Sequence, residues 1–331
     1  MEAQAILFTA PHAVGYGPVE VLDPEPGDVV VRTLVTVVST GTDTRTLAGR
    51  QAGGTFPLVP GYSSVGVVEK VVGNTANVKP GDLVLAGGAK GFKHVNRCWG
   101  AQVSVAVRPA AGLFPLDRRR SPAEYCFATV AAVALHGMRR SFSEPGDRVL
   151  VLGQGLIGQL HARVQAAMGR EVAAVDIQPW RLERALAGGA RHVINAHEQD
   201  VCAAARAIWP EGPQVAVEAT ARQEGLDLCV ELLRKRAWGG DDRMPVLVVQ
   251  STFVGCMSFD YDGLFMAEAL VVPTRSTDPR DLLGAAEMIG NGALRVDDLI
   301  TLRARPNDAA EAFQELLAHP ERHMTIVFEW T

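Results

Sequence analysis

A strand, a glycine-rich loop and a helix follow one another in residues 148–176, and they constrain the fold more than any other feature. The apolar run Val149–Leu152 is typical of a strand buried on both faces of a parallel sheet. It leads into Gly153, Gly155 and Gly158. In a G-x-G-x-x-G loop the first glycine permits a tight turn, the second admits a pyrophosphate, and the third lets the next helix pack closely. The pattern predicts a dinucleotide-binding unit.

The residues that follow the loop indicate which dinucleotide it binds. A helix over about 156–168 directs the free N–H groups of Leu156 and Ile157, and its positive dipole end, toward the phosphates. A second buried strand ends at Asp176, 18 residues beyond Gly158, where an acid accepts the ribose hydroxyls. A carboxylate there repels a 2′-phosphate, so we predict NAD rather than NADP.

Four further residues are expected near the cofactor. Gln250 and Ser251 follow a buried strand and are expected beside the nicotinamide, and Thr220 is expected as another cofactor contact. Three interpretations of Arg181 are open: its charge weakens the preference for NAD, its side chain stacks near the adenine, or it faces water.

Composition limits the class of protein. The 331 residues are 47% apolar, enough for two domains with real cores. A net charge of −5, with both signs mixed along the chain, argues against nucleic acid or an anionic membrane as the partner. No apolar run reaches a membrane span and no leader pattern is present, so we expect a cytoplasmic protein. The five cysteines form no C-x-x-C pair, which favours reduced thiols over disulfides or a zinc ribbon.

Hydrophobic periodicity predicts a β-rich segment followed by alternating strands and helices. The expected β-rich strands are Ala5–Phe8, Asp28–Val38, Ser64–Val72, Asp82–Ala86 and Ala101–Val107. A helix then starts at Ser121, with Pro and Glu at positions typical of a cap. The strands of the alternating region are expected at 148–152, 171–176, 214–218, 245–249 and 270–273. Helices at 279–289 and 307–317 and a strand at 325–329 complete the chain.

This order, together with several short motifs, resembles the medium-chain dehydrogenase/reductase superfamily over nearly the whole chain. The motifs are Pro57-Leu-Val-Pro-Gly61, Ala131-Ala-Val-Ala-Leu-His-Gly137, Pro145-Gly-Asp-Arg-Val-Leu-Val-Leu-Gly153 and the segment 292–300. The resemblance implies an α/β protein with a discontinuous GroES-like, β-rich catalytic domain (1–125 and 278–331). It also implies a Rossmann domain with a doubly wound parallel sheet (126–277). By family analogy we expect a homodimer paired through the strand Leu270–Pro273.

The positions of the family's catalytic zinc ligands depart from the zinc-dependent pattern. A Cys-Gly-x-Asp motif is replaced by Thr40-Gly-Thr-Asp43, and Gly-His-Glu is replaced by Gly61-Tyr-Ser63. The acidic ligand position falls on Thr129, and residues 86–100 hold a single cysteine in place of the four-cysteine lobe. Zinc needs thiolate, imidazole or carboxylate ligands, so we predict a protein without zinc.

The same stretches look most like a zinc-free branch that includes bacteriochlorophyllide a dehydrogenase. The matching segments are 39–43, 57–63, 153–159 and 324–330. That enzyme oxidises a 1-hydroxyethyl side chain to an acetyl group with NAD. The resemblance therefore implies hydride transfer at a CH–OH or C=O carbon, on a substrate that the branch leaves open.

Without a metal, a hydrogen-bond donor must stabilise the substrate oxygen and one proton must be managed. Tyr62, at the position of the family's histidine ligand, is the first candidate donor, with Thr40 and Thr42 as supplements. Thr42 matches the position that starts the family's proton relay, and Asp43 would orient the relay or accept the proton. The alternatives are that Tyr62 fills the volume of the metal and that Asp43 ties down its own turn.

A basic loop at 87–97 offers a second candidate site. It carries Lys90, Lys93, His94 and Arg97. On one reading the loop clamps an acidic substrate and His94 acts as acid or base. On the other it is a solvated loop without a catalytic role.

These features predict a zinc-independent, NAD-dependent oxidoreductase that interconverts a secondary alcohol and a ketone on a secondary-metabolite or pigment-like intermediate. The main rival is an NAD(P)H-dependent reductase of an activated C=C bond or a quinone. That chemistry usually accompanies NADPH, against which Asp176 argues. A protein that binds NAD(H) without catalysis is the third reading.

Overall fold

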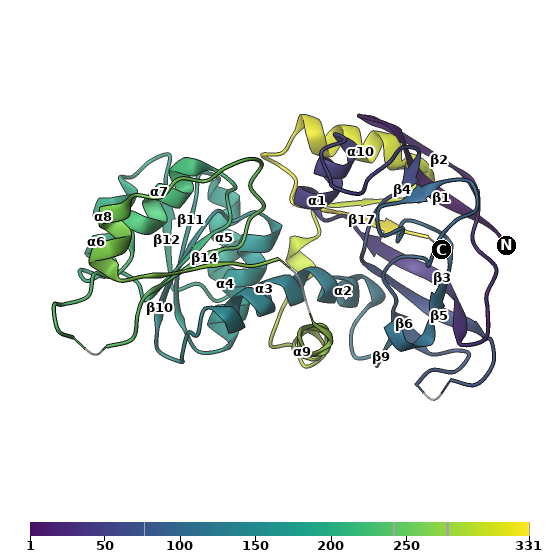
Figure 1. Ribbon diagram of the computed structural model, residues 1–331, viewed down its shortest axis with the longest axis horizontal. Coiled ribbons are helices and arrows are strands. Elements are labelled where there is room, and N and C mark those ends of the chain that lie inside the picture. The colour runs from purple at the N-terminus through teal and green to yellow at the C-terminus, as the bar shows by residue number, and fades with distance from the viewer. Residues whose placement is uncertain (76, 241, 276–277, 331) are drawn as a thin grey trace. The chain divides into compact units, whose positions relative to one another are not determined.

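The computed structural model describes residues 1–75, 77–240, 242–275 and 278–330, which form two units (Figure 1). The β-rich unit comprises Met1–Thr129, Ala286–Gly292 and Val296–Thr331. The α/β unit comprises Val130–Ala285 and Ala293–Arg295. Helices α3 (Ala128–Arg140) and α9 (Pro279–Gly290) each pass from one unit into the other.

The β-rich unit is built from two sheets. A seven-stranded sheet has the order β16-β17-β3-β5-β6-β9, with β8 paired to β3, and a four-stranded sheet has the order β2-β1-β4-β7. Its strands are β1 (Glu2–Ala10), β2 (Ala13–Glu20), β3 (Asp28–Val37), β4 (Leu58–Val59), β5 (Ser64–Val71), β6 (Leu83–Leu85), β7 (Asn96–Arg97), β8 (Val105–Pro109), β9 (Phe114–Leu116), β16 (Leu302–Ala304) and β17 (Ile326–Glu329). Its helices are α1 (Thr40–Leu47), α2 (Pro122–Cys126) and α10 (Ala309–Ala318), with single 3₁₀ turns at Ala110–Gly112, Asp297–Leu299 and Pro306–Asp308.

Strand β3 organises this unit because both of its faces are buried. Alternate residues enter different cores: Val29 and Val31 pack into one, and Val30 packs into another. A third core holds Phe313 of the amphipathic helix α10 against Phe8, with ring centroids 5.3 Å apart. Helix α1 starts just after β3, so the polar residues 39–43 lie at the end of a rigid strand.

The α/β unit has a six-stranded, entirely parallel sheet in the order β12-β11-β10-β13-β14-β15. Its strands are β10 (Arg148–Leu152), β11 (Glu171–Asp176), β12 (His192–Asn195), β13 (Val215–Glu218), β14 (Val246–Val249) and β15 (Leu270–Pro273). Besides α3 and α9 it contains α4 (Leu156–Ala167), α5 (Pro179–Ala187), α6 (Val201–Ile208), α7 (Gln223–Leu232) and α8 (Tyr261–Ala267). Helices α4 and α5 pack into the core on one face of the sheet and α6 and α7 into the core on the other. The expected fold class, with a GroES-like part and a doubly wound sheet, is confirmed.

The direction of winding reverses between β10 and β13, which are neighbours in the sheet. In open α/β sheets ligands bind at such a reversal, beyond the carboxyl ends of the strands. The glycine-rich loop follows β10 and lies at this edge.

Three local predictions needed revision. The expected strand Ala101–Val107 is β8, four residues later, because Ala101 and Gln102 instead donate backbone hydrogen bonds to Gly61 and Pro60. Strands β2 and β12 were not anticipated; β2 contains two glycines and a proline, which strands disfavour. The cap at Ser121 is confirmed as a complete capping box, although the helix breaks at Phe127 into α2 and α3.

No helix among the described ranges is long and apolar enough to cross a lipid bilayer.

Candidate active site

The glycine-rich loop has the geometry that its sequence predicts. Gly153 has φ +90°, and a Cβ there would lie 2.8 Å from Thr220 Cγ2. A Cβ on Gly158 would overlap the carbonyl oxygen of Gly153, so the strand and helix α4 approach too closely for any larger residue. A Cβ on Gly155 would meet nothing within 4 Å. Gly155 precedes Leu156, the first residue of α4, so the helix begins at an open space large enough for an added group.

Asp176 lies at the carboxyl end of β11 and is held against this loop. Its Oδ2 accepts the backbone N–H of Gln154 at 2.6 Å, and Oδ1 accepts that of Gln178 at 2.9 Å. The carboxylate is 9% exposed. It therefore presents a fixed negative charge next to the loop. Arg181 places its guanidinium over the Trp180 ring, 5.2 Å from the centroid.

Glu218, which sequence reasoning missed, joins three of the expected cofactor residues. Its Oε1 accepts both the backbone N–H of Thr220, at 2.6 Å, and the Thr220 hydroxyl, at 2.5 Å. Its Oε2 accepts the hydroxyl of Ser251, and its carbonyl accepts the N–H of Gln250 at 2.9 Å. Glu218 is fully buried at the end of β13. The available signal was the same as for Asp176: an acid that ends a buried strand.

Gln250 lies in a tightly packed polar cluster. A Cβ on Gly137 would overlap Gln250 Oε1 and lie 3.1 Å from His161 Nε2. Gln250 Oε1 and both ring nitrogens of His161 are buried and have no hydrogen-bond partner among the described residues. Burial lowers the pKa of His161 to about 4, so its ring is neutral at physiological pH.

Tyr62 lies among hydroxyl groups in the β-rich unit. Its half-buried ring packs edge-on against Trp99, with centroids 5.5 Å apart. The hydroxyls of Ser39 and Thr42 are neighbours of the phenol that act to lower its pKa. Burial raises the pKa of Tyr62 to about 12, and the negative charge of Asp43 adds to the rise. The phenol therefore stays protonated at neutral pH and is able to donate a hydrogen bond.

Asp43 is a buried carboxyl group beside Tyr62. It is 1% exposed, and its Oδ2 accepts the backbone N–H of Ser39 at 2.9 Å. Its Oδ1 has no hydrogen-bond partner in the described part of the chain. Burial raises the pKa of Asp43 to about 7, although the N–H groups of Ser39 and Gly61 oppose the shift. The group therefore exchanges a proton near neutral pH.

The structure brings Thr42, Asp43 and Tyr62 together, with Ser39 as a member that sequence reasoning missed. Ser39 is the residue before α1, so its N–H and hydroxyl both point into the cluster. The hydroxyl of Thr40 donates to the carbonyl of Met324 at 3.1 Å and ties α1 to the segment before β17.

His94 is not part of this cluster. Its side chain is 78% exposed, and its Nε2 lies 3.9 Å from Glu20. The neighbouring Lys90 pairs with Asp28 at 2.5 Å, and Lys93 pairs with Glu20 at 3.1 Å. Acids of the same unit thus compensate these two charges of the loop. No contact of the described residues joins His94 to Tyr62 or Asp43.

Only one cluster of potential metal ligands occurs within the described residues. His136, Asp278 and Asp281 have ligand atoms within 4.8 Å of one another. Asp281 is fully buried, accepts from His136 at 2.8 Å and pairs with Arg139, so its charge is already compensated. This cluster lies in the α/β unit, whereas Thr40 and Tyr62 lie in the β-rich unit.

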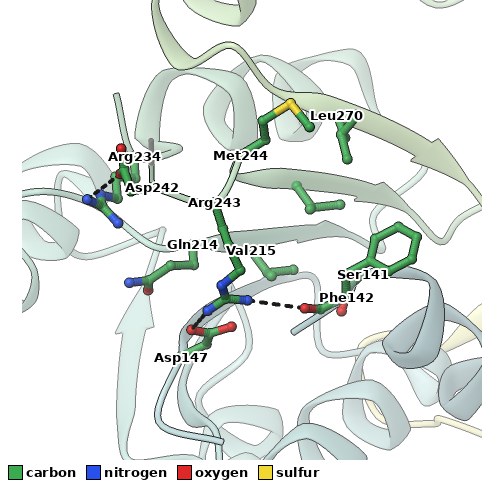
Figure 2. Close-up of a pocket in the computed structure, with 11 residues that line it drawn as sticks. Ser141, Phe142, Asp147, Gln214, Val215, Arg234, Asp242, Arg243, Met244 and Leu270 are labelled. Atoms are coloured by element: carbon green, nitrogen blue, oxygen red, sulfur yellow. Dashed lines mark hydrogen bonds and ion pairs between the residues drawn. The ribbon is translucent and has the colours of Figure 1, made fainter. Parts of the chain in front are cut away.

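A cavity of about 390 Å³ opens at the opposite end of the parallel sheet (Figure 2). Asp147, Gln214 and Met244 line it, and they lie before or at the amino ends of β10, β13 and β14. Figure 2 shows Arg243 reaching from one wall to Asp147, at 2.6 Å, and to the carbonyl of Phe142. The cavity is remote from the carboxyl ends of the strands, so we do not assign the cofactor to it.

Comparisons with known proteins agree with this architecture. The profile of the alcohol dehydrogenase GroES-like domain matches residues 25–118, and that of the zinc-binding dehydrogenase family matches residues 157–238. The 2-desacetyl-2-hydroxyethyl bacteriochlorophyllide A dehydrogenase of Rhodobacter capsulatus is 30% identical, covering 100% of this chain and 99% of the relative. The protein of the same name from Cereibacter sphaeroides is 26% identical with the same coverage.

Solved structures share the fold over the whole chain. A short chain alcohol dehydrogenase from Escherichia coli CFT073, in complex with NADH, has a TM-score of 0.86 at 17% identity and covers 99% of each chain. A structure from Sinorhizobium meliloti 1021 with bound NADP has a TM-score of 0.85 at 19% identity and covers 100% of each chain. The chain belongs to the medium-chain dehydrogenase/reductase superfamily and is an oxidoreductase of that superfamily.

Proposed function

We propose that this protein is a zinc-independent, NAD-dependent dehydrogenase that interconverts a secondary alcohol and a ketone on a biosynthetic, pigment-like intermediate. The observation that carries the proposal is the Tyr62 cluster, where a phenol at the position of one of the family's metal ligands lies beside hydroxyls and one buried carboxyl group that titrates near neutral pH. The 30% identical relative, named for a hydroxyethyl-bearing bacteriochlorophyllide, supports the choice of an alcohol carbon. We further propose that the β-rich and α/β parts are the catalytic and the cofactor-binding domains.

The residues of the α/β unit fit a nicotinamide dinucleotide. The open space at Gly155 and the start of α4 suit a pyrophosphate, and Asp176 suits ribose hydroxyls and opposes a 2′-phosphate. Glu218 holds Thr220 and Ser251 in one arrangement, so both have fixed positions before a ligand arrives. A bound nicotinamide supplies or accepts the hydride.

The proposal of zinc independence rests on the donor set. Thr40, Tyr62 and Thr129 offer neutral oxygens where a catalytic zinc requires sulfur, imidazole or carboxylate. The zinc-binding dehydrogenase profile matches residues 157–238, which include none of these three positions. The profile is therefore compatible with a chain that does not bind catalytic zinc.

Proton handling follows from the two pKa shifts in the cluster. Tyr62, with a pKa of about 12, donates a hydrogen bond to the substrate oxygen and stabilises the charge that develops there. Asp43, with a pKa of about 7, is ionised above neutrality and is the proposed acceptor of the alcohol proton. Alcohol oxidation should therefore accelerate as the pH rises through about 7.

We also propose a cytoplasmic homodimer that pairs through β15. This strand is the last in the parallel sheet, hydrogen-bonded only to β14 within the described residues, and Leu270 is 37% exposed. The five cysteines are all free, as suits a reducing compartment. Light scattering of the purified protein measures the oligomeric state, and a monomer would refute the pairing.

The test of the function uses the protein as purified, without added metal or chelator, with NAD and with NADP on secondary alcohols bearing a 1-hydroxyethyl group. We expect ketone to form with NAD, and the rate with NADP to be at least tenfold lower. Elemental analysis should find far less than one zinc ion per protein chain. Enone reduction with a strong NADPH preference would replace the proposal with the C=C or quinone reductase. NAD(H) binding without turnover of any alcohol or enone would indicate a non-catalytic protein.

A further inference from the structure

Arg108 is a half-buried cation without a counter-ion among the described residues. It lies on β8, opposite Val29 of β3, and its guanidinium lies between Gly87 and Gly112. A Cβ on Gly87 would overlap Arg108 Nη1, and a Cβ on Gly112 would lie 3.1 Å from Nη2. Two glycines thus make the space that the guanidinium occupies.

The donors of Arg108 have no acceptor in the described part of the chain, and no carboxylate pairs with it. Burial first, and the positive charge of Arg97 second, lower the pKa of Arg108 to about 10. Arg97 is exposed on β7 and likewise forms no ion pair with a described residue. Lys90, Lys93 and Arg303 of the same unit, in contrast, pair with acids. A partly desolvated cation beside a like charge is unfavourable, and a bound anion would relieve it.

Arg108 lies close to the main chain of Tyr62. The Cβ position of Gly87 that overlaps Arg108 is only 3.4 Å from the carbonyl oxygen of Tyr62. Trp99, two residues after Arg97, packs edge-on against the Tyr62 ring and is 41% exposed. The guanidinium of Arg108, the main chain of Tyr62 and the exposed ring of Trp99 therefore lie in one region of the β-rich unit.

We propose that Arg108, assisted by Arg97, binds a carboxylate group of the substrate while an apolar part of the substrate lies against Trp99. The inference deepens the proposed function, on which its catalytic consequence rests, because it specifies an alcohol or ketone that also carries an acid group. A planar guanidinium matches a planar carboxylate with two parallel hydrogen bonds. The single guanidinium of Arg108, supported by one exposed arginine, suits a monoanion such as a carboxylate better than a phosphate, which usually needs several donors.

Binding is tested without turnover, so this inference and the proposed function fail separately. Purified protein is titrated calorimetrically with benzoate, with its neutral isostere benzamide and with inorganic phosphate. The variants are Arg108→Gln and Arg97→Gln, and Arg303→Gln is the control because it removes one surface cation that pairs with Glu329. Circular dichroism and thermal midpoints check the fold, and the exposed Arg97→Gln provides a readout if Arg108→Gln unfolds.

We expect benzoate to bind at least tenfold more tightly than benzamide. Arg108→Gln should raise the benzoate Kd about tenfold, Arg97→Gln about threefold, and Arg303→Gln should leave it unchanged. Benzoate affinity that is indifferent to both active-site variants, or absent in the parent protein, overturns the inference. Tighter binding of phosphate than of benzoate at Arg108 overturns the assignment to a carboxylate.

Steady-state kinetics provide the second test of carboxylate recognition. For 4-(1-hydroxyethyl)benzoate, Arg108→Gln should raise KM about tenfold, with kcat within about twofold. For the methyl ester of the same alcohol, KM should not change. An equal rise for acid and ester would show a structural role for Arg108 and would contradict carboxylate recognition.

Discussion

Replacing Asp43 with asparagine should make the protein more stable at alkaline pH. Burial raises the pKa of Asp43 from 3.8 to about 7, so the native state resists ionisation of this group. The shift of about three units corresponds to roughly 4 kcal/mol of unfolding free energy. Below pH 3.8 the carboxyl is protonated in both states and this contribution is fully present. It is lost as the pH rises through about 7, by about 1.4 kcal/mol per unit.

Asp43→Asn removes the ionisable carboxyl group and keeps a side-chain oxygen that can accept a backbone hydrogen bond. The amide oxygen can still accept the N–H of Ser39, as Oδ2 does now. The unfolding free energies of variant and parent should therefore nearly coincide at pH 4. At pH 8 the variant should be more stable by up to about 4 kcal/mol.

The assay is urea unfolding at pH 4.5, 6 and 8, followed by tryptophan fluorescence and by circular dichroism, which must agree for a two-state treatment. Glu69→Gln is the matched control, because it removes an exposed carboxylate whose pairing with Arg32 is worth at most about 1 kcal/mol. A stability difference between Asp43→Asn and the parent that does not change with pH would refute the account of this buried carboxyl.

Other variants test the remaining parts of the site. Tyr62→Phe keeps the ring against Trp99 and removes the donor, so kcat for alcohol oxidation should fall about 100-fold while NAD(H) affinity, measured by fluorescence titration, stays the same. An unchanged kcat would make Tyr62 a packing residue. Gly158→Ala forces a Cβ against the carbonyl of Gly153 and should weaken NADH binding about tenfold; Gly17→Ala, where a Cβ meets nothing within 4 Å, is the control. Asp176→Ser removes the charge that opposes a 2′-phosphate and should raise the NADP to NAD ratio of kcat/KM about tenfold. A ratio that does not move would show that other groups select the cofactor.

Local patterns predicted the local structures well because the forces that form them act within a few residues. The capping box at Ser121 and the left-handed Gly153 depend on neighbours in the chain, and both are present. The error at Ala101–Val107 has the opposite cause. Its alternation is strand-like, yet Ala101 and Gln102 find hydrogen-bond partners in Pro60 and Gly61, about forty residues earlier.

The candidate site also has features that the sequence predicts and features that only the fold determines. Its residue types in the segments 39–43, 57–63 and 153–176 were readable from the chain, and with them the family and the kind of cofactor to expect. For the basic loop at 87–97, the sequence showed a run of positive charges but not which of them pair with acids. The fold determines that Lys90 and Lys93 pair with acids of β2 and β3, while Arg97 and Arg108 form no ion pair within the described ranges.

The sequence by itself determined the order of the elements, the glycine-rich turn, the acid at the end of β11 and the absence of thiolate and imidazole at Thr40 and Tyr62. These depend on residue identity and short-range spacing. Only the tertiary structure decided which groups are buried together: Asp43 beside Ser39 and Gly61, and Glu218 between Thr220 and Ser251. Burial sets the protonation of a carboxyl group, and burial is created by segments distant in the chain, so no local pattern contains it.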